Sequence, residues 1–144
     1  MLISAAPLVA CGPFGPDLGA PSAAAAIARG LRAGGLPEPD ICPLDAAGGS
    51  EVRGMLDALD FDRRMHRARA VILGAERLCE DVLEGSAVFE LATRARQGGV
   101  PAYAVTAVNL LDPFDARILD LQVILRAHGE RGLAAAGRKL AALL

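Results

Sequence analysis

The chain has 144 residues and a formal net charge of −2, and 53% of its residues are apolar although only 3% are aromatic. This length suits one domain whose core is built mainly from Ala, Leu, Val and Ile. The charge does not indicate a nucleic-acid partner. No apolar stretch reaches the about 18 residues that span a membrane, so we expect a cytoplasmic protein with no membrane contact.

The first half of the chain predicts two strands, each followed by a helix. In chain order these are residues 2–10 (strand), 22–33 (helix), 40–44 (strand) and 50–67 (mostly helix). Pro21 precedes the first helix and Gly34 closes it. The second helix ends in a cluster of arginines around His66, which is either a solvated helix end or a weak anion-binding patch.

The second half predicts three further strands and two helices. In chain order these are residues 70–73 (strand), 86–97 (helix), 101–106 (strand), 121–125 (strand) and 130–144 (helix). The strand at 70–73 is a continuous apolar run, which is typical of a buried parallel strand. The last helix contains Lys139, the one lysine among fifteen basic residues, so a phosphate site that requires lysine has no other to use.

Strands that alternate with helices of about three turns indicate βαβ units and a parallel sheet. Right-handed crossovers favour a three-layer sandwich. We therefore expect one α/β domain over residues 1–144, Rossmann-like or flavodoxin-like, with a mostly parallel sheet of about four or five strands. Ligands of such folds bind at the carboxyl ends of the strands, which here lead into residues 11–19, 45–50, 74–86 and 106–115.

Two polar features at these strand ends have alternative interpretations. Asn109, Asp112 and Asp115 either reach the ligand-binding edge or act as cap and turn residues. The three cysteines, Cys11, Cys42 and Cys79, are odd in number and lie far apart, which argues against a disulfide framework and a zinc site. We expect them to be small buried apolar side chains.

Four segments carry a resemblance to a known family. They are VACGPFGPDLGAPSAAAAIARGL (residues 9–31), CPLDAAGGS (42–50), VILGAERLCEDVLEGS (71–86) and VPAYAVTAVNLLDPFDARILDLQV (100–123). In this order they resemble segments of the bacterial two-domain glycerate kinases, which phosphorylate glycerate with ATP and magnesium. The family has a second domain between the second and third segments, where this chain has only residues 51–70. The resemblance therefore implies a shortened, single-domain member with one wall of the family's cleft.

The resemblance is stronger for residues that set shape than for residues that carry charge. Phe14, Gly74 and Gly85 fall on matching family positions. The family's lysine after the phenylalanine is Gly15 here, and the lysine that ends its third segment is Ser86. Its acids after the first glycine and in the second segment are also replaced, with Asp45 standing one position early. Because phosphoryl transfer needs positive charge and metal-binding carboxylates, the resemblance implies the fold without the kinase chemistry.

Arg77 is the main ligand-binding candidate, because an arginine beside a strand end binds a carboxylate or phosphate through two hydrogen bonds. Its alternative role is an ion pair with a neighbouring acid. Glu76 and Asp81 are weak candidates for a metal site, against a solvated acidic loop. The remaining ligand candidates follow from the resemblance, and they are Gly74, Glu76, Gly85, Ser86, Phe14, Gly15, Asp17 and Asp45.

We therefore expect a non-catalytic protein that binds a small anion, such as an organic acid or phosphate, or that has a regulatory or partner-binding role. No cofactor is expected. The alternative is an active glycerate or hydroxy-acid kinase that uses ATP and magnesium and completes its cleft by oligomerisation; a third reading is a structural subunit without a ligand. A lost facing domain would expose apolar surface, so we expect a homodimer.

Overall fold

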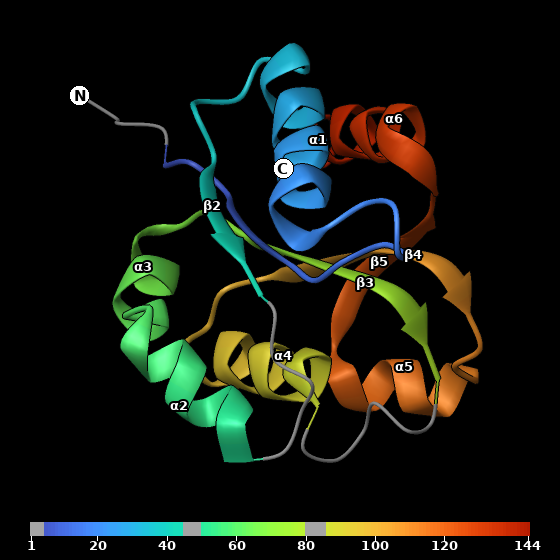
Figure 1. Ribbon diagram of the computed structural model, residues 1–144. Coiled ribbons are helices and arrows are strands. Elements are labelled where there is room, and N and C mark those ends of the chain that lie inside the picture. The colour runs from blue at the N-terminus through green and yellow to red at the C-terminus, as the bar shows by residue number, and fades with distance from the viewer. Residues whose placement is uncertain (1–4, 45–49, 80–85) are drawn as a thin grey trace.

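The computed structural model describes residues 5–44, 50–79 and 86–144, which form a five-stranded sheet and its flanking helices (Figure 1). In chain order the elements are β1 (Leu8–Cys11), α1 (Ala20–Ala33), β2 (Asp40–Pro43), α2 (Ser50–Ala58), α3 (Phe61–Arg67), β3 (Val71–Leu78), α4 (Ala87–Gln97), β4 (Ala102–Asn109), α5 (Pro113–Leu119), β5 (Leu121–Arg126) and α6 (Gly129–Ala141). All strand pairs are parallel, in the order β2-β1-β3-β4-β5. The predicted α/β, flavodoxin-like sandwich is therefore confirmed.

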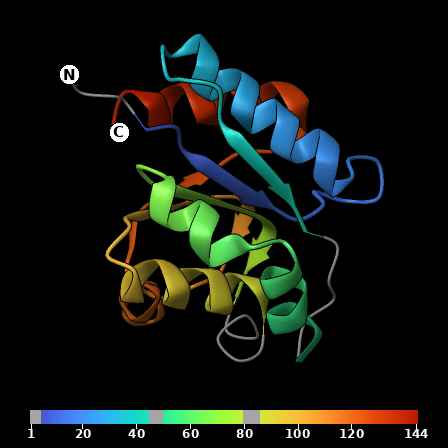
Figure 2. The ribbon, with the colours of Figure 1, turned by 90° about the vertical axis from the view of Figure 1, so that its left-hand side faces the viewer.

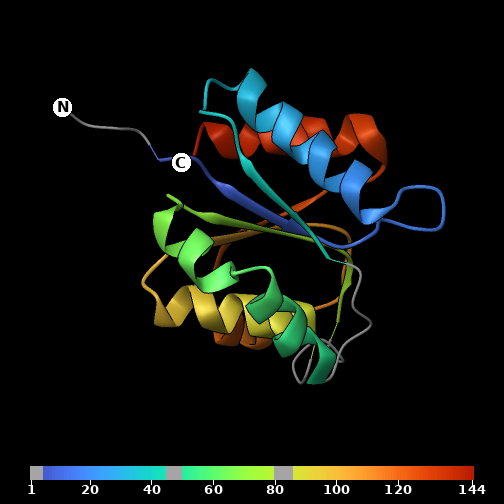
Figure 3. The ribbon, with the colours of Figure 1, turned by 60° about the vertical axis from the view of Figure 1, so that its left-hand side comes forward.

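Helices cover the two faces of the sheet unequally. The pair α1 and α6 lies on one face, and α2 to α5 lie on the other (Figures 2 and 3). Alternate residues of β1 enter the two cores, with Leu8 packed towards α2–α5 and Val9 towards α1 and α6. Every residue of β1 is buried, as expected for a central parallel strand covered on both sides. Within the described residues, no helix is both long and apolar enough to cross a membrane.

Strand β3 is longer than predicted. The apolar run was expected to end at Leu73, but β3 continues to Leu78 because β4 continues beside it, with Arg77 opposite Val108 and Leu78 opposite Asn109. Arg77 therefore lies inside a strand and not in a loop after one. A strand partner supplies hydrogen bonds regardless of side-chain polarity, so hydrophobicity alone placed this boundary too early.

The predicted helix at residues 50–67 is two helices, separated at Asp60. Asp60 adopts a left-handed conformation with φ of +56°, which ends α2 and starts α3 in a new direction. The arginine cluster of α3 is not simply solvated. Arg64 donates to both carboxylate oxygens of Asp40 at 2.6 and 2.9 Å and to the Ile41 carbonyl at 2.9 Å, which ties α3 to β2.

Helix α5 was not predicted, although its start has a readable signal. Asp112 is the N-cap, its side chain accepts a hydrogen bond from the Asp115 backbone N–H at 2.8 Å, and Pro113 follows at the first helical turn. The Asn109 side chain likewise accepts from the Leu111 N–H at 3.1 Å. The cap-and-turn interpretation of Asn109 and Asp112 is therefore confirmed.

Helices α1 and α6 cross in near contact of their backbones. A Cβ atom placed on Gly30 would lie 1.9 Å from the Ala134 carbonyl oxygen, and one on Gly137 would lie 2.3 Å from the Ile27 carbonyl oxygen. No side chain fits at either position unless the helices separate. The two glycines therefore set how closely α6 rests on α1.

We expect Gly30→Ala to lower the free energy of unfolding by about 1–3 kcal/mol, because the added methyl group overpacks the helix crossing. Gly54→Ala is the matched control, since Gly54 lies within α2 with no atom within 4 Å of its added Cβ. The control should gain about 0.5–1 kcal/mol from helix propensity. Denaturant unfolding at 25 °C measures both, and equal effects of the two changes would contradict the proposed close crossing.

Candidate functional site

The strand order creates a crevice between the carboxyl ends of β1 and β3. The chain leaves β1 into α1 on one face of the sheet and leaves β3 towards α4 on the other face (Figure 3). Connections that diverge in this way leave a hollow where parallel α/β sheets ordinarily bind ligands. A cavity of about 180 Å³ lies there, lined by Gly12, Pro13, Leu44, Leu73, Gly74, Ala75, Glu76, Ala87, Val88 and Leu91.

The chemistry of this cavity does not favour an anion. Glu76 is the one charged side chain among the described lining residues, and no arginine or lysine joins it. The N-terminus of α4 offers a partial positive charge, but its cap Ser86 already accepts a hydrogen bond from the Phe89 N–H at 3.1 Å. Within the described residues, no group of three His, Cys, Asp or Glu side chains could hold a metal ion. The cavity is therefore small, mostly apolar and weakly acidic.

Gly74 has a packing role at this crevice. A Cβ atom at this position would lie 2.4 Å from the Cys11 sulfur, so only glycine lets β3 pass β1 here. The Gly74 carbonyl accepts a hydrogen bond from the Gly12 N–H at 2.9 Å, which holds the start of the β1–α1 loop. Burial raises the pKa of the Cys11 thiol to about 12, so this sulfur is not a nucleophile near neutral pH.

The loop between β1 and α1 contains three of the predicted ligand residues. Phe14 is only 8% exposed and belongs to the core under α1, a placement that packing alone explains. Gly15 has φ of +93°, and a Cβ there would come within 3.0 Å of a Glu76 carboxylate oxygen. Asp17 is exposed. The loop therefore carries one acid, Asp17, and no cation.

Arg77 is exposed, does not line the cavity and forms no ion pair with another described residue. The predicted role of Arg77 in anion binding stays a prediction. Asp45, Gly85 and Asp81 lie outside the described residues, so their proposed ligand and metal roles also remain predictions.

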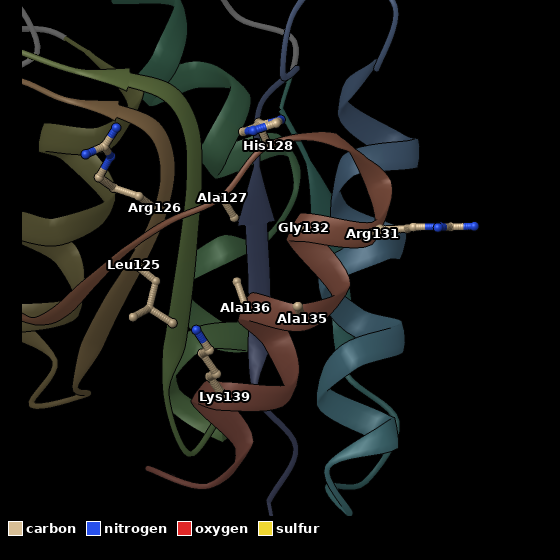
Figure 4. Close-up of a pocket in the computed structure, with 9 residues that line it drawn as sticks. All are labelled: Leu125, Arg126, Ala127, His128, Arg131, Gly132, Ala135, Ala136 and Lys139. Atoms are coloured by element: carbon tan, nitrogen blue, oxygen red, sulfur yellow. The ribbon is translucent and has the colours of Figure 1, made fainter.

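A larger hollow, which sequence reasoning missed, lies between the edge strand β5 and helix α6. This β5–α6 groove is open, has a volume of about 590 Å³ and is lined by Leu125, Arg126, Ala127, His128, Arg131, Gly132, Ala135, Ala136 and Lys139 (Figure 4). The α6 residues among them recur at helical spacing and so form one face of the helix. The opposite wall is apolar, formed by Leu125 and Ala127.

The charges that line this groove all have one sign. Arg126, Arg131 and Lys139 are cationic, no Asp or Glu lines the groove, and none of the three forms an ion pair with another described residue. Lys139 extends from α6 towards Leu125, whereas the side chains of Arg126 and Arg131 extend away from the groove (Figure 4). The isolation of Lys139 as the only lysine was the one available sequence signal, but its neighbours across the groove come from a separate strand.

Comparisons with known proteins identify the fold and not the family. No family model matches the sequence, and no curated protein matches it. A response regulator receiver domain from Rhodospirillum rubrum matches with a TM-score of 0.54 and 15% identity, covering 95% of this chain and 92% of that chain. A proposed glycerate kinase 2 from Salmonella typhimurium LT2 matches with a TM-score of 0.48 and 14% identity, over 73% of this chain.

The match spans only 27% of the Salmonella chain, and its TM-score is too low to carry an argument about this protein. The receiver-domain match supports the flavodoxin-like fold and, at 15% identity, nothing about function. Membership of the glycerate kinase family is therefore not established, and the likeness stays a resemblance of short segments.

The burial of the cysteines predicts their reactivity. Cys11 and Cys42 are buried and burial raises the pKa of both thiols, whereas Cys79 is partly exposed. We expect iodoacetamide at pH 8 to modify Cys79 in the native protein and to leave the other two unmodified until the protein is unfolded. Mass spectrometry of the modified peptides measures this, and rapid native labelling of Cys11 would contradict the described β1–β3 packing.

Proposed function

We propose that this chain is a non-catalytic binding domain that holds an anionic ligand in the β5–α6 groove. The observation that carries the proposal is Lys139, which extends from α6 towards Leu125 in a groove lined by no Asp or Glu and has no ion-pair partner among the described residues, with Arg126 and Arg131 at the rim (Figure 4). Unpaired cations at the rim of an apolar hollow attract carboxylates and phosphates, and arginine and lysine are the residues that bind them in proteins.

The cavity between the carboxyl ends of β1 and β3 supports the non-catalytic part of the proposal. A phosphoryl-transfer site stabilises the transferred group with cations and a bound metal. The described residues of the cavity offer Glu76 as their only charge, and the family lysine expected in the β1–α1 loop is Gly15 here. Thr106 of β4, which pairs with Ala75 of β3, is buried. Its hydroxyl lies 3.1 Å from the backbone carbonyls of Glu76 and Val108, so it hydrogen-bonds to the backbone and not to a ligand.

The groove is a better anion site than the end of β3. At the end of β3 the described residues near the β1–α1 loop include the acid Glu76, which lies close to Gly15 of that loop. Arg77 does not line the cavity there, and Glu76 is the one charged side chain among the described lining residues of that cavity. Lys139, by contrast, extends into a groove with no Asp or Glu among its described lining residues.

We expect phosphoglycerate to bind in calorimetric titration and Lys139→Ala to weaken that binding roughly tenfold, because a charge-assisted hydrogen bond is lost. Arg138→Ala is the matched control, since Arg138 is exposed on the same helix and does not line the groove. Arg77→Ala should leave the affinity unchanged. If Arg77→Ala abolishes phosphoglycerate binding and Lys139→Ala does not, the anion binds at the end of β3 and not in the groove.

The kinase alternative is tested with the same protein. Glycerate with Mg-ATP should give no saturable ADP release under the proposed function. Turnover that disappears in a folded Arg77→Ala variant would overturn the non-catalytic proposal and favour a hydroxy-acid kinase.

We also propose that the chain forms a homodimer through an apolar surface at the end of β4 and on α5. Leu110 is 54% exposed and Phe114 is 66% exposed, and Ile118 follows Phe114 by one helical turn, so the two share a face of α5. Exposed apolar side chains that gather in this way are typical of an interface.

Light scattering at micromolar concentration should give twice the monomer mass, and Phe114→Glu should give a monomer. A monomeric wild-type protein would contradict the proposal.

A further inference from the structure

We infer that the ligand of the β5–α6 groove is an amphiphilic acid, with one carboxylate at Lys139 and a hydrocarbon body that lies along the groove. This inference rests on the proposed anion-binding function and names the class of ligand. Three features of the groove lead to it, namely its apolar floor, its length along α6 and its single inward cation.

The sheet beneath the groove is apolar and only partly covered. Val105 of β4 pairs with Leu125 of β5, and both pack in the core under α1 and α6. Val105 is fully buried, whereas Leu125 keeps part of its surface exposed. The cover that the two helices give to β4 therefore stops at β5. Ala127 is also partly exposed on this side, so a hydrocarbon that lies here removes apolar surface from water.

The wall formed by α6 leaves room for an extended ligand. Gly132 and Ala135 lie one helical turn apart, and neither carries a side chain longer than a methyl group. Ala136 is already buried in the core, so the free wall is the surface of these two residues. The groove runs from His128 to Lys139, about 16 Å along the helix axis (Figure 4). An extended chain suits this shape better than a compact anion does.

One cation reaches over the apolar floor. Lys139 extends towards Leu125, whereas Arg126 and Arg131 extend away from the groove (Figure 4). Among the described residues, no Asp or Glu lines the groove and none forms an ion pair with Lys139. A single ammonium group matches a single carboxylate, and its four-carbon stem adds apolar surface. A ligand with several charges, such as phosphoglycerate, would hold the others over apolar surface without a partner.

The test compares ligands that share one hydrocarbon chain and differ in their head group. Calorimetric titration of the full chain at low salt measures the affinity for octanoate, octanamide, octylammonium and phosphoglycerate. We expect octanoate to bind at least about tenfold more tightly than the other three, because it alone supplies both a carboxylate for Lys139 and an apolar body. Octanamide lacks the charge, octylammonium reverses it, and phosphoglycerate lacks the hydrocarbon.

Chain length tests the apolar floor without any change to the protein. Each methylene group that the groove removes from water should strengthen binding about two- to fourfold, so the affinity should rise from butanoate through hexanoate to octanoate. An affinity that does not depend on chain length would overturn the inference, because the hydrocarbon would then lie outside the groove.

Two pairs of variants locate the ligand. Lys139→Met keeps an unbranched apolar side chain, removes the charge and should weaken octanoate binding roughly tenfold. Arg138→Met is the matched control, since Arg138 is exposed on the same helix and does not line the groove. Leu125→Ala should weaken binding about fivefold, whereas Val123→Ala, on the same strand but outside the lining, should have little effect. Octanoate binding that Lys139→Met leaves unchanged would place the ligand elsewhere and overturn the inference.

The outcomes separate this inference from the proposed function. If phosphoglycerate binds as tightly as octanoate and Lys139→Met weakens both, the groove is a general anion site, so the proposed function stands and the amphiphile inference is overturned. Equal binding of octanamide and octanoate would also overturn it, because charge would then play no part. If neither octanoate nor phosphoglycerate binds, the proposed function fails together with the inference that rests on it.

Discussion

The close crossing of α1 and α6 determines which parts of the sheet are covered. Gly30 and Gly137 let the two backbones approach to a distance at which even a methyl group would collide with a carbonyl oxygen. Because α1 itself packs over β1 and β2, α6 is held near the centre of the sheet and not over its far edge. A helix in close contact with its neighbour cannot also spread outwards, so β5 keeps an open side. The groove is therefore a consequence of tight packing elsewhere in the same layer.

A second constraint shapes the opposite region, where β3 and β4 extend beyond β1. The ladder continues to Leu78 and Asn109, and the Thr106 hydroxyl is within hydrogen-bonding distance of the Glu76 carbonyl beside it. Residues 74–78, which the sequence placed in a ligand loop, are instead the last residues of β3. Glu76 faces the glycine loop after β1, and the cavity beneath it is small and mostly apolar. The region has the outline of a ligand site and, in its described residues, few of the groups that would bind an anion.

The sequence predicted every strand and most of the helices because their signals are local, whereas α5 was missed although its cap is local as well. Apolar runs, the Ser86 cap and the closing glycines mark strands and helix ends within a few residues of where they occur. Features that depend on a distant partner were not predictable in this way. Gly30 and Gly54 are both glycines inside helices, yet one lies against another backbone and the other faces open space. Likewise, Arg64 pairs with Asp40, 24 positions earlier, and no local pattern distinguishes it from its solvated neighbours.

The same distinction explains why the candidate site moved. Gly74 and Phe14 lie in the segments that resemble glycerate kinases, and packing accounts for both: Gly74 leaves room for the Cys11 side chain, and Phe14 fills the core under α1. The resemblance at these two positions therefore follows from packing and carries no information about function. Chemistry is carried instead by charged groups that packing does not require. Lys139 is such a group: it extends from α6 towards Leu125 of β5 (Figure 4), so its place in the groove depends on the fold although the residue does not maintain that fold.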